Sequence, residues 1–418
     1  MKLILQNATI LDPQSPWNGK QKDILIEDGI IRKIGDKISA KEALKENFKG
    51  CVVTPGFCDL YVQIGDPGFE HREDIHSVSE AANAGGFTTI CALADNHPVT
   101  QNKSQVEYIL QKSKSTSTNI LPIGAITENF DGKTPTEMYD MHHAGAVAFS
   151  DMPHPIKDAG VLARSLQYVQ PFNGLIMSMP YDSSLAQEGQ VNESAVSVRM
   201  GMKGIPNVSE YAALQRDIEL LKYTGGRLHV MGVSCKESVA LIRAAKKEKL
   251  KVTATVFVHH LISTEEQASA YESQYKVFPP LRSKEDQLEL IKGVQDGTID
   301  CISTQHTPLD SEAKNLEFEY ASFGMIGLET AFALLLSKTK LSKEKIQACL
   351  SANPNKILGR KNSIQENFPA ELAVINLDES WTIDEKNIRS KSKNLPYIGE
   401  TVKGKVKAVF NKGKIRKF

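Results

Sequence analysis

Apolar and polar residues alternate at both ends of the chain. Near the amino end, LILQNATIL alternates apolar and polar positions, and DILIEDGIIRKIG contains two such runs around an Asp-Gly pair. This period of two predicts strands, and the Asp-Gly pair predicts a tight hairpin between two of them. The last fifty-odd residues repeat the pattern in ELAVINL and in GKVKAVF, which is followed by the turn residues Asn411, Lys412 and Gly413 and then KIRKF. Both ends are therefore predicted to be β-rich.

Between residues 54 and 359 the pattern changes to strand-length apolar runs that alternate with amphipathic stretches. The strand candidates are FTTICALA, ILPIGAI, GAVAFS, GLIMSM, RLHVMGVS, VTATVFV and TIDCIST. The clearest helices are VSEYAALQRDIELLKY, KESVALIRAAKKEKL and KEDQLELIKGVQDG, with apolar residues at three- and four-residue spacing. Strands that are apolar on both faces and alternate with helices predict a parallel sheet covered by helices.

The length of this middle region fits a (β/α)8 TIM barrel with loop insertions. We therefore expect an α/β protein with a barrel over residues 54–359. Residues 1–53 and 360–418 are expected to form one small, discontinuous β-sandwich domain. An open doubly wound sheet is the alternative, but no GxGxxG follows an early strand.

Composition removes several classes of function. The chain has 418 residues, with 50 Lys+Arg against 50 Asp+Glu, so it lacks the net positive charge typical of nucleic-acid binding. No apolar run approaches the roughly 20 residues that span a bilayer, and the amino end turns polar too early for a signal peptide. The cysteines form no CxxC pair, which is typical of reduced thiols in a cytoplasmic protein. They are Cys51, Cys58, Cys91, Cys235, Cys301 and Cys349.

The residues from Pro55 to His71 read PGFCDLYVQIGDPGFEH and give the first sign of a family. This segment resembles the dihydroorotase branch of the amidohydrolase superfamily, whose motif reads PGxxDxHxHxREPG(F/Y)E(H/Y)KED. Further matches follow in order along nearly the whole chain. They include AANAGGFTTI, AVAFSD, GIPNVSE, RLHVMGVS, VTATVFVHHL, KVFPPLR, DGTIDCISTQHTP, SANPNKILG and SKSKNLPYIGETVKGKV. The resemblance implies a metal-dependent barrel that carries a small β-sandwich built from both termini.

The chemistry that the resemblance implies needs zinc held by histidine and acidic ligands, which activates water to attack a cyclic amide. The two histidines of HxH are replaced by Tyr61 and Gln63. Two further ligand histidines are replaced by Met179 and Gly232. The aspartate that binds metal and shuttles the proton is replaced by Gln305, an amide that cannot accept that proton near neutral pH. Only Asp151 is retained, so we expect neither a catalytic residue nor a bound metal.

The positions that contact substrate in the family are also changed. Gly65 stands where an arginine binds the substrate carboxylate, and Asp95 stands where an asparagine does. Losing the arginine removes a bidentate contact, and Asp95 adds repulsion toward an anion. Phe278 and Leu309 replace the remaining polar contacts. The sequence therefore predicts a vestigial substrate pocket at these four positions.

A different metal site is the alternative, with zinc held by Asp151 and two of the remaining histidines His229, His259, His260 and His306. Against it, adjacent His259 and His260 are expected to point to opposite faces of a strand. Residues 70–74, EHRED, are expected to form a solvated charged loop or the start of a helix.

Three functions remain open. The first is a catalytically inactive dihydroorotase homologue of pyrimidine biosynthesis, a homo-oligomer (dimer) that acts as an assembly partner, for example of aspartate carbamoyltransferase. The second is an active zinc-dependent dihydroorotase or a related cyclic amidase, such as a hydantoinase or allantoinase relative. The third is a metabolite sensor that binds its ligand among Tyr61, Gln63, Asp95, Phe278 and Gln305.

Overall fold

The apolar runs in the middle of the chain form eight parallel strands in the computed structural model, which describes residues 2–418. Neighbouring strands pair in chain order, and almost every residue in them is buried, because helices cover the outer face while side chains fill the interior. The strands are β6 (Phe57–Val62), β7 (Phe87–Ala92), β8 (Asn119–Gly124), β9 (Ala148–Phe149), β10 (Ile176–Ser178), β13 (Leu228–Met231), β14 (Val252–Phe257) and β15 (Cys301–Ser303).

The two outer strands of this sheet meet just beyond their carboxyl ends. Val62 and His306 form a parallel bridge, and the backbone N–H of Gln63 donates to the carbonyl of His306 at 3.0 Å. This contact brings the first and last strands together, so the sheet is a nearly closed barrel. The predicted barrel is confirmed, and the open doubly wound alternative is wrong.

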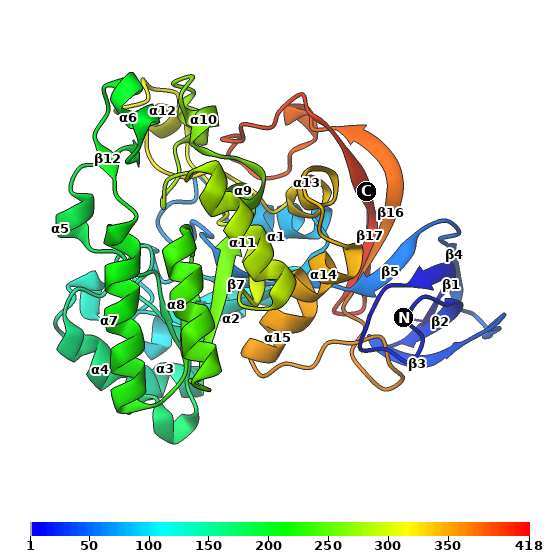
Figure 1. The fold of residues 1–418 in the computed structure, drawn as a ribbon. Coiled ribbons are helices and arrows are strands. Elements are labelled where there is room, and N and C mark those ends of the chain that lie inside the picture. Colours follow the sequence, from blue (N-terminus) through cyan, green and yellow to red (C-terminus); the bar gives the residue numbers. More distant parts are fainter. Residues whose placement is uncertain (1) are drawn as a thin grey trace.

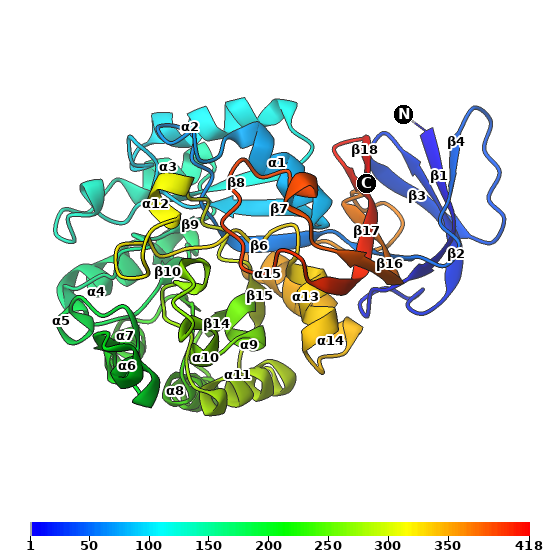
Figure 2. The same ribbon diagram turned by 90° about the horizontal axis from the view of Figure 1, so that it is seen from above.

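Helices surround the barrel, as Figures 1 and 2 show. The helix that follows β6 begins at Asp74, whose carboxylate accepts from the backbone N–H groups of His76 and Ser77 and so caps it. The covering helices are α1 (Ile75–Ala84), α2 (Lys103–Lys112), α3 (Met138–Ala144), α4 (Ala159–Tyr168), α7 (Val208–Thr224), α8 (Lys236–Lys247), α11 (Lys284–Asp296), α13 (Ala331–Lys338), α14 (Lys343–Gln347) and α15 (Asn353–Ile357).

Shorter elements lie in the connections. Two-residue strands pair in a loop after β10, and single turns of helix follow several strands. These elements are α5 (Ser183–Ala186), β11 (Val191–Asn192), α6 (Ala195–Met200), β12 (Gly204–Ile205), α9 (Val258–Ile262), α10 (Glu265–Ala268), α12 (Ser311–Lys314), the 3-10 turns Ser113–Ser115, Glu128–Phe130, Gln170–Phe172, Ser273–Tyr275 and Glu385–Asn387, and a π-helical turn Ala348–Ala352.

The two ends of the chain share one bent sheet beside the barrel (Figures 1 and 2). Its order is β18-β17-β16-β5-β1-β2-β3, with β4 also paired to β1, and it encloses its own apolar cluster. The predicted β domain from both termini is therefore confirmed, whereas the domain limits stay a prediction. Its strands are β1 (Lys2–Ile10), β2 (Gln21–Glu27), β3 (Ile30–Gly35), β4 (Leu44–Asn47), β5 (Val52–Pro55), β16 (Leu372–Thr382), β17 (Thr401–Asn411) and β18 (Lys414–Lys417).

Both predicted hairpins are present in this sheet. Asp28 and Gly29 join β2 to β3 with φ of +50° and +77°, and Lys412 and Gly413 join β17 to β18 with φ of +50° and +69°. Positive φ at both central residues matches the right-handed twist of the flanking strands. Among residues 2–418, no helix is both long and apolar enough to cross a membrane.

Candidate functional site

The candidate site lies at the carboxyl ends of the barrel strands, where side chains from separate strands converge. Each position expected from the sequence lies at or within two residues of a strand end. The positions are Tyr61 and Gln63 at β6, Asp151 after β9, Met179 after β10, Gly232 after β13 and Gln305 after β15. Their side chains decide whether the mouth of the barrel can hold a metal.

Tyr61 is a packed core residue. Its side chain is 2% exposed, and its ring lies edge-on to the ring of Phe257 at 5.3 Å. Burial, and then the charge of Asp95, raise the pKa of the phenol, while hydrogen bonds to Gln305, Thr307 and Gln63 act in the opposite direction. The phenol therefore stays neutral at physiological pH and offers no charged ligand.

The space in front of Gly232 is filled by apolar side chains. A Cβ atom at this position would lie 2.7 Å from Cε2 of Phe257 and 3.5 Å from the sulfur of Met179. Met179, Phe257 and Tyr61 belong to one buried apolar cluster. A histidine at position 232 therefore has no room unless Phe257 moves, and the place of a ligand is taken by packing.

The side-chain amide of Gln305 donates a hydrogen bond inside the protein. Its Nε2 donates to the carbonyl of Phe278 at 2.5 Å, and its Oε1 is buried without a hydrogen-bond partner among residues 2–418. The ring of Phe278 packs edge-on to Tyr181 at 4.5 Å. Gln305 thus carries no basic atom that could take a proton from water.

Asp151, the retained acidic residue, is fully engaged by the turn after β8. Its carboxylate accepts from the backbone N–H of Ile126 at 2.7 Å and from the backbone N–H and hydroxyl of Thr127 at 3.0 and 2.5 Å. Burial raises the pKa of this carboxyl, and the three bonds oppose that shift. Asp151 therefore has a structural role that needs no metal.

The remaining histidines do not rebuild a metal site. His229 lies between the hydroxyls of Thr253 and Thr255, both at 2.8 Å, and burial lowers its pKa to about 3. His306 pairs with Glu73 at 3.4 Å.

The expectation that His259 and His260 lie on a strand and point to opposite faces is wrong. Both lie in α9, the helical turn that follows β14, and both are buried with their rings 4.5 Å apart. Across residues 2–418, no three His, Cys, Asp or Glu side chains are grouped so that they could hold a metal ion. The donor set at the mouth, with its phenol, amides, thioether and glycine, does not fit zinc.

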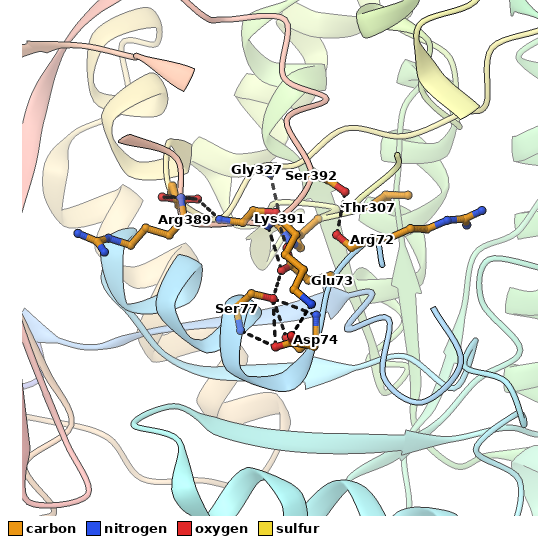
Figure 3. A network of polar contacts seen from close by, with 12 residues as sticks. Arg72, Glu73, Asp74, Ser77, Thr307, Gly327, Arg389, Lys391 and Ser392 are labelled. Carbon is orange, nitrogen blue, oxygen red and sulfur yellow. Dashed lines mark hydrogen bonds and ion pairs between the residues drawn. The ribbon is translucent and has the colours of Figure 1, made fainter. Parts of the chain in front are cut away.

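Within residues 70–74, Glu73 departs from the expectation of a solvated charged loop or the start of a helix. Asp74 does start a helix, but the side chain of Glu73 is 0% exposed and receives hydrogen bonds from Ser77, Ser390 and the backbone N–H of Lys391 (Figure 3). Burial raises the pKa of this carboxyl, and the bonds from His306, Ser390 and Ser77 outweigh it, so that the net pKa is lowered. The burial of the Glu73 carboxylate could not be predicted from the sequence, because its partner Ser390 lies 317 residues away.

A cavity of about 370 Å³ opens at the mouth, above the packed cluster. Gln63, Gly65, Asp95 and Leu309 line it, whereas Phe278 and Gln305 do not. At Gly65 φ is +67°, and a Cβ atom would lie 2.4 Å from the carbonyl oxygen of Glu73, so this backbone has no room for a side chain. Three of the four vestigial positions thus share one cavity.

The fold resembles solved structures of cyclic amidohydrolases. The L-hydantoinase (dihydropyrimidinase) from Arthrobacter aurescens matches with a TM-score of 0.87 and 25% identity, over 99% of this chain and 95% of that chain. A D-hydantoinase matches with a TM-score of 0.85 at 20% identity, which shows the fold alone. The barrel with its terminal sheet is therefore of the cyclic amidohydrolase class.

Sequence comparison narrows that class to a family. The dihydro-orotase-like family model matches residues 50–238. A dihydroorotase of Caldanaerobacter subterraneus subsp. tengcongensis is 38% identical over 422 residues, covering 100% of this chain and 97% of the relative. A dihydroorotase of Syntrophotalea carbinolica is 37% identical over 420 residues, covering 99% of each. The chain belongs to the dihydroorotase family.

Proposed function

We propose that this protein is a dihydroorotase homologue of pyrimidine biosynthesis that does not hydrolyse dihydroorotate. Packing of Phe257 and Met179 into the space beside Gly232 carries the proposal, because it occupies the position from which a ligand histidine would reach a metal. Tyr61 and Gln305 support it, since neither supplies a charged ligand or a base. Another donor could compensate for one replaced metal ligand. Replacement at five positions together removes the side chains that zinc-dependent hydrolysis requires. These positions are Tyr61, Gln63, Met179, Gly232 and Gln305.

Metal content and turnover of the purified protein test this proposal. The protein is expressed in zinc-supplemented medium, and the Caldanaerobacter dihydroorotase is treated identically as a positive control. We expect less than about 0.1 zinc per chain and no zinc-dependent hydrolysis of dihydroorotate, because a catalytic site binds metal stoichiometrically. One zinc per chain together with metal-dependent turnover would reject the proposal.

The same experiment decides for or against an active zinc-dependent dihydroorotase or a related cyclic amidase. Full-length similarity to proteins named dihydroorotase favours this second function. Including a hydantoin and allantoin among the substrates extends the test to the related amidases.

We further propose that the protein acts in the cytoplasm as a homodimer and as a structural partner of aspartate carbamoyltransferase. An intact barrel framework around a filled site supports this role, because a partner needs the surface of the fold and not its chemistry. All six cysteines are free and buried, in keeping with a reducing compartment. Size-exclusion chromatography with light scattering should give a dimer alone and a larger species after mixing with the transferase of the same organism. Separate elution at micromolar concentrations would contradict the partnership.

A further inference from the structure

The cavity at the mouth has aromatic walls. Phe69 comes from the loop between β6 and α1, Phe130 from the turn after β8, and Phe323 from the segment after α12, and all three are partly exposed. Aromatic faces carry partial negative charge and attract cations that come within about 6 Å of the ring centre. Cations of the protein already lie over two of these rings, Arg72 over Phe69 at 5.2 Å and Nζ of Lys276 over Phe323 at 4.8 Å. The walls therefore favour a flat occupant, and a preference for charge has to come from other groups.

Hydrogen-bond acceptors at this cavity lack donors. Within residues 2–418, the carboxylate of Asp95 has no side-chain partner and bonds only to its own backbone N–H. Oδ1 of Asn96 is buried without a partner, while its Nδ2 donates to the carbonyl of Leu93 at 3.3 Å and to the hydroxyl of Thr100 at 3.2 Å. Since a carbonyl only accepts, the amide orientation is fixed with its oxygen unpaired.

The positive groups around the cavity are already engaged or lie at its rim. Nε of Arg72 donates to Asp310 at 3.1 Å, and its guanidinium lies over the ring of Phe69. Burial lowers the pKa of His154, which faces Asp151, and His97 is exposed. No cation among the described residues thus pairs with Asp95.

We propose that this cavity binds a small organic cation, a primary ammonium or amidinium with a short flat body. The ammonium donates to the carboxylate of Asp95 and to Oδ1 of Asn96, and the body packs between Phe69, Phe130 and Phe323. A ligand of this kind supplies both the donors and the charge that the cavity lacks, which offsets the cost of leaving a carboxylate partly desolvated. Binding does not depend on whether the protein hydrolyses dihydroorotate.

Three probes of nearly equal shape test the proposal by calorimetry at pH 8: benzylammonium, benzyl alcohol and benzoate. We expect benzylammonium to bind at least tenfold more tightly than the other two. Asp95→Asn should remove at least tenfold of that affinity. Glu128→Gln is the matched control, because Glu128 is an exposed carboxylate on the same side of the barrel that does not line the cavity. This substitution should leave the affinity for benzylammonium unchanged.

A measurement on the unmodified protein covers the case in which Asp95→Asn fails to fold. Burial raises the pKa of Asp95 to about 7, so lowering the pH from 8 to 6 protonates most of it. Benzylammonium stays charged over this range, and its affinity should fall about fivefold or more while that of benzyl alcohol stays constant. Where Asp95→Asn folds, the pH dependence of benzylammonium affinity that remains in this variant measures the contribution of all other groups around the cavity.

Three outcomes would overturn the proposal. Benzoate or benzyl alcohol binding as tightly as benzylammonium rejects a cation site, as does full affinity in folded Asp95→Asn. Absence of measurable benzylammonium binding up to 10 mM, about 3 kcal/mol of affinity, rejects it as well.

Discussion

At Gly232 the packing of the mouth depends on a single missing atom. The backbone φ is +74°, and a Cβ atom added there would lie 2.7 Å from the ring of Phe257. Gly201 has a similar φ of +63° at the end of α6, but nothing lies within 4 Å of the place its Cβ would take. A side chain at Gly201 would meet backbone strain alone, whereas a side chain at Gly232 would meet both backbone strain and steric crowding.

Gly232→Ala should destabilise the protein more than Gly201→Ala. Each substitution costs about 1 kcal/mol for a left-handed residue with a side chain. Gly232→Ala should cost a further 1–3 kcal/mol, roughly the penalty for overpacking a core. Urea unfolding at equilibrium measures both free energies. Equal losses would mean that Phe257 moves aside freely, and the mouth would then have room for a ligand side chain.

The positions at the mouth were located by the resemblance to the dihydroorotase motifs, and each lies at or within two residues of a strand end. By that resemblance, Tyr61 and Met179 stand where the family has histidines. What fills the space was not predictable, since Phe257 belongs to an ordinary strand motif and only the fold brings it against Gly232. Likewise, the three bonds that occupy Asp151 come from a turn 24 residues or more away in sequence.

Among the elements, Glu73 links three parts of the chain. Its carboxylate receives bonds from Ser77 in α1, from Ser390 and Lys391 in the segment before β17, and from His306 after β15 (Figure 3). Gly327 donates its N–H to Nδ1 of His306, so the proton of this imidazole lies on Nε2, facing Glu73. The buried carboxylate of Glu73 therefore anchors residues 389–392 to the barrel.

Glu73→Gln should loosen that segment specifically. The amide cannot accept from all four donors, and the loss should cost about 2–3 kcal/mol, as for charged buried hydrogen bonds. Hydrogen exchange followed by mass spectrometry should show faster exchange at residues 389–395. Glu107→Gln, at an exposed position of α2, serves as the control. Unchanged exchange at 389–395 in Glu73→Gln would show that other contacts hold the segment.

Strands and helices were largely predictable because hydrophobic periodicity is a local signal. VSEYAALQRDIELLKY forms α7 and VTATVFV contains β14, close to the expected limits. The exceptions are positions whose conformation or burial depends on residues far away in the sequence. His259 and His260 continue an apolar run that reads as strand, yet the chain turns into α9 there. Glu73 stands in a run of charges, and only its distant partners reveal its burial.

At the scale of the whole molecule, the terminal sheet and the barrel share an apolar interior. Val402, Val406 and Val409 of β17 belong to the same cluster as the barrel helices, and Phe332 of α13 stacks on Phe57 of β6 at 5.3 Å. The opposite face of β17 contributes Phe410 to the cluster enclosed by the terminal sheet. The pairing of β17 with β16 is irregular between Val406 and Ala408, and beyond this point alternate residues enter the cluster of the terminal sheet. One strand thus joins both cores, which predicts that the two domains unfold together.

The positions of the tryptophans allow a direct test of this cooperativity. The chain has two, Trp17 and Trp381, both in the terminal β domain, whereas the α-helices lie between residues 75 and 357. Trp17 packs on the cluster of the terminal sheet, whereas Trp381 packs on the cluster that includes the barrel helices. Fluorescence of Trp17 in a Trp381→Phe variant therefore reports the sheet, and circular dichroism at 222 nm reports mainly the barrel. The two transitions in urea should coincide, and Phe410→Ala should shift both by the same amount, losing about 3–5 kcal/mol as for a buried phenylalanine. If the fluorescence transition alone shifts, the domains unfold independently, and the small size of the sheet, not its union with the barrel, would set its stability.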